Sequence, residues 1–397
     1  MNGRQRSESM KNDTLHNAGK NAEFADPDIL KVGKPSIRIT VDSNGIINME
    51  SEKGIGGLYL IFNAEYGIYS LIDRDTGHSV SAGQYGYLHE YLDTEKLFGA
   101  PPSSLSLVFG NGPAALSQIR VFPVGKIPDY VQAWEPPLYG CADMALFSAH
   151  GDDEQLFFAG LLPLYAGERH YAVQVIYLTD HGQTEKERIH EMLNGLWAVG
   201  VRHYPVFGHF ADFMSDSLEK TYAQYEALGT DRDELLRFVV TQVRRFKPKV
   251  AVGHDLNGEY GHGMHRIYAD LLTKASEISN DETAFPESAE QYGVWKIPKL
   301  YLHLYEKNTL VMDYDKPLKA FDGMSAFQVT QKKGYPCHRS QQETWFTSWI
   351  NGKEQPIEKA AQIGTYSPCR FGLYSASVPV DGTEKDMMEN VTPYSAR

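Results

Sequence analysis

Two short runs of histidine and acidic residues carry the side chains of this sequence that are best suited to chemistry. The first is His150-Gly151-Asp152-Asp153-Glu154, directly after an apolar run at 144–148. The second is the stretch 252–265, VGHDLNGEYGHGMH, which begins at the end of another apolar run. Three adjacent carboxylates repel one another unless a cation or solvent takes up their charge. A metal site is therefore the first hypothesis for these two runs.

The spacing of the histidines suits a catalytic metal. His262 and His265 are three residues apart at the start of an expected helix, so their imidazoles lie on one side of it. His150, Asp152 and Asp153 offer the remaining ligands. Two histidines and one carboxylate around zinc leave a coordination position open for water. Zinc lowers the pKa of such a water towards neutrality, and a second acid beside it can act as general base.

Each run has a simpler interpretation when it is taken alone. A lone histidine at a strand end is more often a solvated or capping group than a ligand, and an acidic run is usually a solvated surface. Glu154 and Glu259 could equally be acids at helix starts, where they interact favourably with the helix dipole. His181, His190 and His254 lack the context of a site. Two runs that both follow strands of one sheet favour the metal site.

The chain around these runs alternates between strand-like and helix-like periods. Strands are expected at 143–150, 172–180, 201–208 and 249–255, and helices at 153–167, 184–200, 231–248 and 262–278. This order predicts an α/β fold, a Rossmann-like and mostly parallel sheet with helices on both faces. Ligands bind such sheets beyond the carboxyl ends of the strands, where both runs lie. No G-x-G-x-x-G turn follows the first strand, so a dinucleotide is not expected.

The pattern weakens after about residue 281. A strand is expected at 299–305 and a helix at 338–351, followed by an irregular tail that contains 371–382. The predicted catalytic domain therefore spans 138–397, with an irregular C-terminal extension.

The region before this domain has a different pattern. Short β-prone runs at 36–43, 45–51, 56–64, 66–73, 104–109 and 117–124 alternate with glycine and proline turn signals. They predict an all-β sandwich, jelly-roll-like, over residues 36–134. Its many tyrosines fit core packing, but a carbohydrate-binding surface is the alternative. A linker is expected at 125–137, and the polar residues 1–35 predict a disordered leader.

Composition limits the partners and the compartment. The 397-residue chain has a formal net charge of −13, which disfavours nucleic acid and anionic membranes as partners. No apolar run is long enough to form a transmembrane segment. The leader resembles the spacer that follows an export signal, so we expect an extracellular or cell-surface protein, with the cytoplasm as the alternative. Cys337 and Cys369 could form a disulfide, and no C-x-x-C pair is present.

Several motifs together resemble the LmbE-like, or PIG-L, family of zinc-dependent N-deacetylases. They are A-H-G-D-D-E at 149–154, Leu178-Thr179-Asp180, the Arg188, Glu191 and Gly200-Val201 pattern, and G-E-Y-G-H-x-x-H at 258–265. The resemblance covers about 143–278 and, more loosely, His338-Arg339-Ser340-Gln341. The family includes enzymes that remove acetyl from N-acetylglucosamine in glycolipids, thiol precursors and chitooligosaccharides. The β-domain lies outside this region and is similar to the extra N-terminal part of longer bacterial members.

The resemblance implies a role for each matching residue. It makes His150, Asp153 and His265 the zinc ligands and Asp152 the general base. It also implies that protonated His262 stabilises the oxyanion, that Tyr260 polarises the acetyl carbonyl, and that Arg188 and Asp212 contact the substrate. This chain departs from the family pattern at two positions.

Gly151 replaces the usual proline of the first motif, which is expected to loosen the turn. Met264 replaces an aspartate that partners the oxyanion histidine in several members. We expect His262 to be less basic as a result, or another acid such as Glu259 to replace the partner.

These observations predict a metal-dependent amide hydrolase that removes acetyl from an N-acetylated amino sugar or polysaccharide. Zinc is the expected metal, with iron or manganese as alternatives. A deacylase acting on another amide is a close rival. A non-catalytic carbohydrate-binding protein with a degenerate Rossmann-like half is a rival of a different class. The sequence leaves the sugar and the oligomeric state open.

Overall fold

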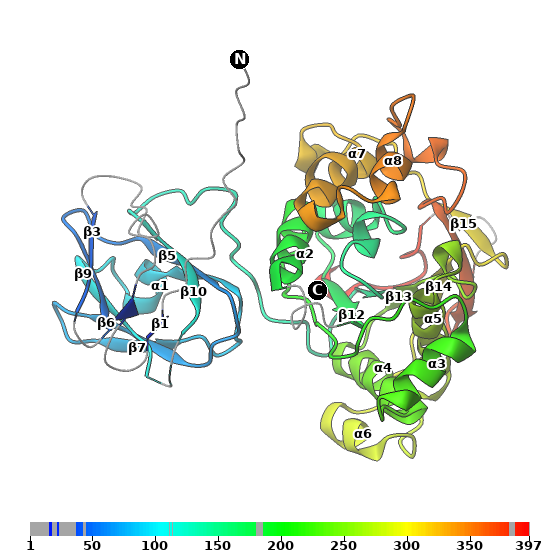
Figure 1. The fold of residues 1–397 in the computed structure, drawn as a ribbon, viewed down its shortest axis with the longest axis horizontal. Helices are drawn as coiled ribbons and strands as arrows, with labels where there is room; N and C mark the ends of the chain where they lie inside the picture. The colour runs from blue at the N-terminus through cyan, green and yellow to red at the C-terminus, as the bar shows by residue number, and fades with distance from the viewer. Residues whose placement is uncertain are drawn as a thin grey trace. The chain divides into compact units, whose positions relative to one another are not determined.

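The computed structural model describes residues 16–17, 22–23, 37–42, 45–110, 112, 114–179, 186–380 and 386–396. The chain divides into two compact units, Met1–Trp134 and Glu135–Arg397 (Figure 1). Most of the predicted leader at 1–35 lies outside the described residues. Its described part is an antiparallel pair of two-residue strands, β1 (His16–Asn17) and β2 (Ala22–Glu23).

The first unit is built from two antiparallel sheets. The larger has the order β3 (Ile37–Val41), β4 (Ile47–Ser51), β9 (Ser104–Val108), β6 (Tyr69–Asp73) and β7 (Ser79–Ala82). The smaller has the order β10 (Leu116–Phe122), β5 (Gly57–Phe62) and β8 (His89–Asp93), and the short helix α1 (Thr94–Phe98) follows β8.

Strands occur at all six predicted runs of the first unit. β7 and β8 were not predicted, because the sequences SVSA and HEYLD lack an apolar alternation. The jelly-roll arrangement stays a prediction.

The second unit contains one six-stranded mixed sheet. Its order is β12 (Val173–Tyr177), β11 (Met144–Ser148), β13 (Val250–Gly253), β14 (Lys299–His303), β16 (Arg370–Ala376) and β15 (Thr309–Val311). The first four strands are parallel, and β16 runs antiparallel to both of its neighbours. Every residue of the parallel strands is buried, as their apolar sequences require.

Helices cover this sheet on both sides (Figure 1). One side carries α3 (Leu218–Ala227), α4 (Arg232–Phe246), α5 (Gly263–Ile278) and α6 (Pro286–Tyr292), and the other carries α2 (Lys186–Ala198), α7 (Ala326–Val329) and α8 (Trp345–Asn351). Asp231 caps α4 by accepting the backbone N–H of Glu234. The α/β class is therefore confirmed. No helix in the described ranges has the length and apolar character of a membrane span.

Three predicted elements before the C-terminal tail differ from the structure. The helix expected at 153–167 is a 3₁₀ turn (Asp153–Gln155) and a separate π-helical turn (Pro163–Glu168), because Gly160 between them has a left-handed φ of +96°. The strand expected at 201–208 is an extended edge with isolated bridges beside β12, where Pro205 offers no N–H. The helix expected at 338–351 is a 3₁₀ turn (Arg339–Gln341) followed by α8.

The C-terminal tail also differs from its prediction. The tail expected to be irregular contributes β16 to the sheet. Its Gly372 leaves room for the backbone of Tyr305, since a Cβ there would lie 2.1 Å from the carbonyl oxygen of Tyr305.

Candidate metal centre and active site

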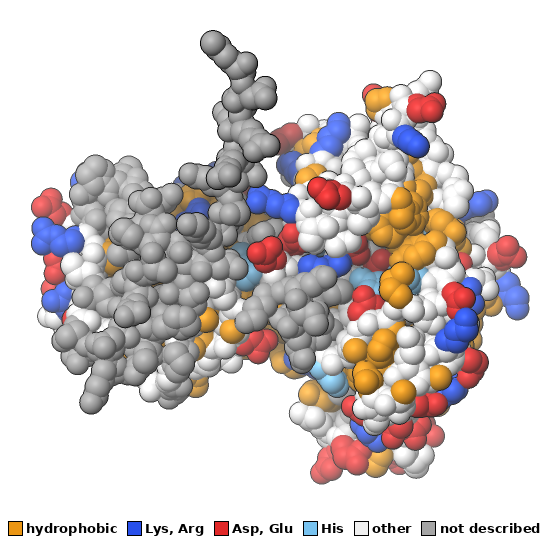
Figure 2. Space-filling view, in the orientation of Figure 1, with side chains coloured by type: hydrophobic (Ala, Val, Ile, Leu, Met, Phe, Trp, Pro, Cys, Tyr) orange, Lys and Arg blue, Asp and Glu red, His pale blue; other side chains and the backbone are white. Residues whose placement is uncertain are grey.

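The two chemically loaded runs meet because their strands are neighbours. β11 and β13 pair in parallel, with Met144 opposite Val250 and Leu146 opposite Val252. The segments that follow β11 and β13 therefore leave the sheet at the same edge. Nδ1 of His150 lies 3.2 Å from Nε2 of His265. Histidine side chains reach the surface of this unit among acidic and hydrophobic ones (Figure 2).

Three buried side chains point one ligand atom each towards a common centre. Oδ2 of Asp153 lies 3.0 Å from Nδ1 of His150 and 3.2 Å from Nε2 of His265. With the 3.2 Å between the two nitrogens, these atoms form a nearly equilateral triangle. Tetrahedral zinc with ligands at about 2.0–2.1 Å has ligand atoms about 3.3–3.4 Å apart. The triangle therefore fits a zinc-sized cation with little adjustment.

The outer nitrogens of both histidines face carboxylates. Nε2 of His150 lies 3.1 Å from Oδ1 of Asp212, and Nδ1 of His265 lies 2.8 Å from Oε2 of Glu259. A carboxylate only accepts hydrogen bonds, so with a cation at the centre each ring would carry its proton on the outer nitrogen. The inner nitrogen of each ring then presents its lone pair to the centre, as in carboxylate–histidine–metal sites.

Charge around the centre also favours a cation. Burial alone would lower the pKa of His265, but Asp153 and Glu259 outweigh it and raise this pKa to about 9. Burial opposes the ionisation of Asp153, but the neighbouring His265 and His150 hold its pKa well below its usual range. The carboxylates of the cluster thus favour positive charge between them. A divalent cation would be stabilised by the same electrostatic interaction.

Two further groups of three side chains could hold an ion by distance alone. One is His150, His262 and His265, and the other is Asp153, His254 and His265, each with ligand atoms within 4.8 Å of one another. In the second group, Nε2 of His254 already accepts the backbone N–H of Ala149 at 2.9 Å. The hydrogen bonds therefore exclude His254 as a ligand in this geometry.

His262 is the additional member of the first group. Its Nδ1 accepts the backbone N–H of Met264 at 3.1 Å, so the neutral ring carries its proton on Nε2. Burial, followed by the neighbouring His150 and His265, lowers the pKa of His262 to about 3. Met264 therefore contacts His262 through its backbone N–H. Its side chain offers no carboxylate in place of the aspartate that the resemblance implies at this position. Glu259 does not take over as its partner, because its carboxylate faces other histidines.

The candidate base Asp152 is buried beside the triangle. Nη2 of Arg188 donates to the carbonyl of Gly151 at 2.8 Å and lies 3.7 Å from Oδ1 of Asp152. Burial raises the pKa of Asp152 to about 6, and Arg188 partly offsets this. Arg188, expected to contact substrate, is itself buried and supports the turn that carries Asp152.

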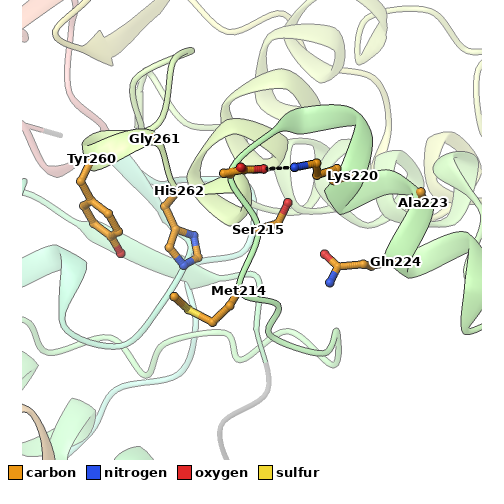
Figure 3. Close-up of a pocket in the computed structure, with 9 residues that line it drawn as sticks. Met214, Ser215, Lys220, Ala223, Gln224, Tyr260, Gly261 and His262 are labelled. Atoms are coloured by element: carbon orange, nitrogen blue, oxygen red, sulfur yellow. Dashed lines mark hydrogen bonds and ion pairs between the residues drawn. The ribbon is translucent and has the colours of Figure 1, made fainter.

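Tyr260 projects from a tight turn that requires left-handed backbone. Its φ is +47°, between Gly258 at +66° and Gly261 at +80°. Its ring centroid lies 5.3 Å from that of His262, and both rings point to the same side in Figure 3.

A cavity of about 710 Å³ opens beside Tyr260 and His262. Its remaining lining residues come from the loop before α3 and from α3: Met214, Ser215, Asp216, Lys220, Ala223 and Gln224, with Gly261 from the second run (Figure 3). Its size is in the range of small-molecule sites, which is about 300–1,000 Å³.

A known protein family matches the region of the chain that contains the ligand triangle. The family described as "PIG-L: GlcNAc-PI de-N-acetylase" matches residues 145–276, which contain both runs. Residues 145–276 are a PIG-L domain.

The curated relatives of this domain are deacetylases by name. The 1D-myo-inositol 2-acetamido-2-deoxy-alpha-D-glucopyranoside deacetylase 1 of Catenulispora acidiphila is 26% identical over 181 residues, covering 40% of this chain and 54% of that protein. A deacetylase of the same name from Mycobacterium leprae is 28% identical over 204 residues, covering 45% and 62%. The chain therefore spans little more than half the length of these relatives.

A solved structure with the same general function in its title is also similar. It is the N,N'-diacetylchitobiose deacetylase of Pyrococcus horikoshii, with 16% identity, 58% of this chain and 84% of that chain covered, and a TM-score of 0.42.

The sequence did not single out His303, and it did not predict the contacts that Glu259 and His338 make. Glu259, considered as a helix-start acid, is fully buried in a 3₁₀ turn and faces three histidines, one of them His303. His338 pairs with Glu154 at 2.9 Å, and both are fully buried. His303 and His338 lie outside the PIG-L domain. The position of His303 at the end of β14 was the one available signal, because β14 is the neighbour of β13.

Aromatic side chains surround the inner part of the site. Phe157 lies against the rings of His265, Tyr260 and Trp349, with centroids 5.5, 5.9 and 5.6 Å away. Trp345, about half exposed, forms a T-shaped pair with Tyr260, with ring centroids 5.7 Å apart. Helix α8, beyond the PIG-L domain, thus helps to fix the ring of Tyr260.

The cysteines Cys141, Cys337 and Cys369 are all free thiols in this structure.

Proposed function

We propose that this protein hydrolyses the N-acetyl group of an acetylated amino sugar and releases acetate, with zinc held by His150, Asp153 and His265. The observation that carries the proposal is the triangle of ligand atoms with a spare carboxylate, Asp152, in the adjacent position of the same turn. The names of the curated relatives, which act on an acetamido-glucopyranoside, support the substrate class.

Asp152, Arg188, His262 and Tyr260 each have a separate role in the proposed hydrolysis. A zinc ion at the triangle would supply Lewis acidity and lower the pKa of a bound water. Asp152 accepts the proton of the attacking water and later delivers it to the leaving amine. Arg188 holds the turn that positions Asp152. The Nε2–H of His262 and the hydroxyl of Tyr260 are the donors available for the oxyanion, which such groups stabilise best when they are preorganised.

This assignment uses His262 as a neutral donor. Its Nδ1 accepts the N–H of Met264, so no carboxylate is needed to orient the ring. The loss of the aspartate expected at Met264 is therefore compatible with the reaction.

The test compares two variants in activity and in metal content. Asp152→Asn should keep about one metal ion per chain and lower acetate release by about 10²–10⁴-fold, the usual contribution of a general base. His150→Ala should lose the metal as well as the activity. Inductively coupled plasma analysis and an acetate assay on the same samples measure both. A fully active Asp152→Asn protein would refute the assignment of the base.

The substrate test is a series of acetylated amino sugars, from N-acetylglucosamine to its oligomers, assayed with and without a chelator. Acetate release that the chelator abolishes is expected from at least one of them. Release of none would favour the carbohydrate-binding alternative, which the complete ligand triangle argues against. Release only from other amides would favour the rival deacylase.

We infer that the unit Met1–Trp134 is an accessory β-domain that contributes to carbohydrate binding. Tyr85, about half exposed, stacks on Tyr87 with ring centroids 5.3 Å apart and an interplanar angle of 15°. Stacked aromatic rings at a surface suit contact with a pyranose ring. Removal of residues 1–134 should weaken polymer binding and spare hydrolysis of small substrates.

A further inference from the structure

Glu259 has an unusual environment for a buried acid. Its Oε2 lies 2.9 Å from Nδ1 of His254 and 2.8 Å from Nδ1 of His265, and its Oε1 lies 2.6 Å from Nδ1 of His303. The backbone N–H of Asp255 also donates to Oε1 at 3.2 Å. All of these side chains except that of Asp255 are fully buried. An isolated carboxylate in such a place is strongly disfavoured, so its partners decide whether it can exist.

The three histidines around Glu259 are not equivalent. The proton of His254 must be on Nδ1, because its Nε2 accepts the N–H of Ala149. Nδ1 of His265 lies 2.8 Å from Oε2 of Glu259, an ion-pair contact without hydrogen-bond geometry, and its Nε2 faces the metal triangle. His254 therefore donates a hydrogen bond to the carboxylate, whereas His265 lies beside it as a charged neighbour.

His303 differs because both of its nitrogens face acceptors. Nε2 lies 2.9 Å from the carbonyl oxygen of Ser367, and Nδ1 faces Oε1 of Glu259. A carbonyl oxygen has no proton to give, so Nε2 must donate. Of the three histidine contacts on Glu259, the one from Nδ1 of His303 is the shortest, at 2.6 Å. His303 therefore ties this carboxylate to the backbone of Ser367.

We propose that His303 is a positioning residue of the metal centre, acting through Glu259 to hold the ring of His265 with its Nε2 lone pair towards the cation. This inference rests on the metal site of the proposed function, but not on the reaction. The chain from Ser367 through His303 and Glu259 to His265 connects β14 and the loop before β16 to the triangle. Two elements beyond the PIG-L domain would therefore set the affinity of a metal inside it.

The packing around His303 allows a clean substitution. Its ring lies among Phe157, Phe158 and Phe371, with centroids 6.2, 5.9 and 5.6 Å away. His303→Phe keeps an aromatic ring of similar size in this apolar surrounding and removes both donors. His303→Gln keeps one amide donor and serves as the conservative variant. His89→Phe is the matched control, since His89 is also buried and hydrogen-bonded, to Tyr59, but belongs to the other unit.

The experiment measures Zn²⁺ affinity of the full-length protein, stripped of metal, by competition with a chromophoric chelator. Removing a partner of this kind lowers metal affinity by about 10–100-fold, so we expect that loss for His303→Phe, a smaller loss for His303→Gln, and no change for His89→Phe. The visible spectrum of the Co²⁺-loaded protein should shift in His303→Phe and not in the control, because the orientation of His265 changes.

A double variant tests whether the effect passes through Glu259. Glu259→Gln should lower affinity in the same way, and the double variant Glu259→Gln with His303→Phe should be no weaker than Glu259→Gln alone. Additive losses would overturn the proposal, and so would a His303→Phe protein that binds Zn²⁺ as tightly as the parent. If His303→Phe does not fold, the affinity of His303→Gln decides in the same way.

Failure of the proposed function gives a different result. A protein that binds Zn²⁺ with the expected dependence on His303 but releases no acetate refutes the reaction and leaves this inference standing.

Discussion

Nε2 of His150 lies 3.1 Å from Oδ1 of Asp212, so a carboxylate contacts the nitrogen of His150 that is not part of the ligand triangle. The resemblance to deacetylases implies that Asp212 contacts the substrate, and its side chain is partly exposed. The structure adds a second task, which is to fix the tautomer of His150. The two tasks predict different kinetic signatures.

Asp212→Ala is expected to weaken Zn²⁺ binding by about 10–100-fold, because the ring of His150 loses the acceptor that orients it. Asp212→Asn keeps an oxygen acceptor and should recover most of the affinity. Chelator competition measures the affinity, and KM for the best acetylated sugar is measured at saturating metal. A rise in KM alone, with unchanged metal affinity in Asp212→Ala, would restrict Asp212 to the substrate.

Metal addition is expected to stabilise the second unit only. A cation that binds the folded triangle and not the unfolded chain stabilises it by about 2.7 kcal/mol at a free concentration 100-fold above Kd. Scanning calorimetry with Zn²⁺ or with a chelator should therefore move the transition of Glu135–Arg397. The transition of Met1–Trp134 is the internal control, and His150→Ala should abolish the shift. Equal shifts of both transitions would indicate non-specific binding.

The core of the site was accessible from the sequence because it depends on local patterns. The apolar runs of β11 and β13 end in polar residues, and parallel neighbours bring their ends together. His150, Asp153 and His265 follow from this rule and from the family motifs.

The surrounding residues depend on long-range order that periodicity does not contain. His303 enters the site only because β14 lies beside β13, and His338 contacts Glu154 at the start of a segment that forms a 3₁₀ turn in place of the predicted helix. The stretch 153–167 has the composition of a helix, but the left-handed Gly160 divides it. In the same way, β16 was missed because Gly372 weakens its strand pattern while a close backbone contact requires that glycine.

Gly151 is expected to be coupled to Met192. A Cβ at position 151 would lie 2.2 Å from the sulfur of Met192, so the methionine of α2 occupies the space that a side chain at position 151 would need. Overpacking of this kind costs about 1–3 kcal/mol, which we expect for Gly151→Ala in urea unfolding. Met192→Ala also destabilises, because it leaves a cavity. The double variant should lose less stability than the sum of the two. Strict additivity would show that Met192 moves aside freely.

Glu90 gives the first unit a pH dependence of its own. This carboxyl belongs to β8 and is buried, and its Oε2 accepts the hydroxyl hydrogen bond of Tyr69 at 2.6 Å while its Oε1 accepts the N–H of Gly83 at 3.2 Å. Burial raises its pKa above the usual value, and these hydrogen bonds offset the rise only in part. The folded state therefore holds the proton more tightly than the unfolded chain. The resulting contribution to stability is present at low pH and is lost as pH rises from the unfolded pKa of about 4.5 through the raised folded pKa.

Glu90→Gln should remove this dependence and stabilise the unit at neutral pH. A glutamine oxygen can still accept the N–H of Gly83, and its amide can donate to the oxygen of Tyr69, so both contacts survive without a buried charge. Hydrogen exchange of peptides covering β6 and β8 should be slower in the variant than in the parent at pH 7 and equal below pH 4. The exposed Glu95→Gln on α1 is the control and should match the parent at every pH. A variant that exchanges faster at pH 7 would mean that the charged form of Glu90 stabilises the sheet, which contradicts the direction of its pKa shift.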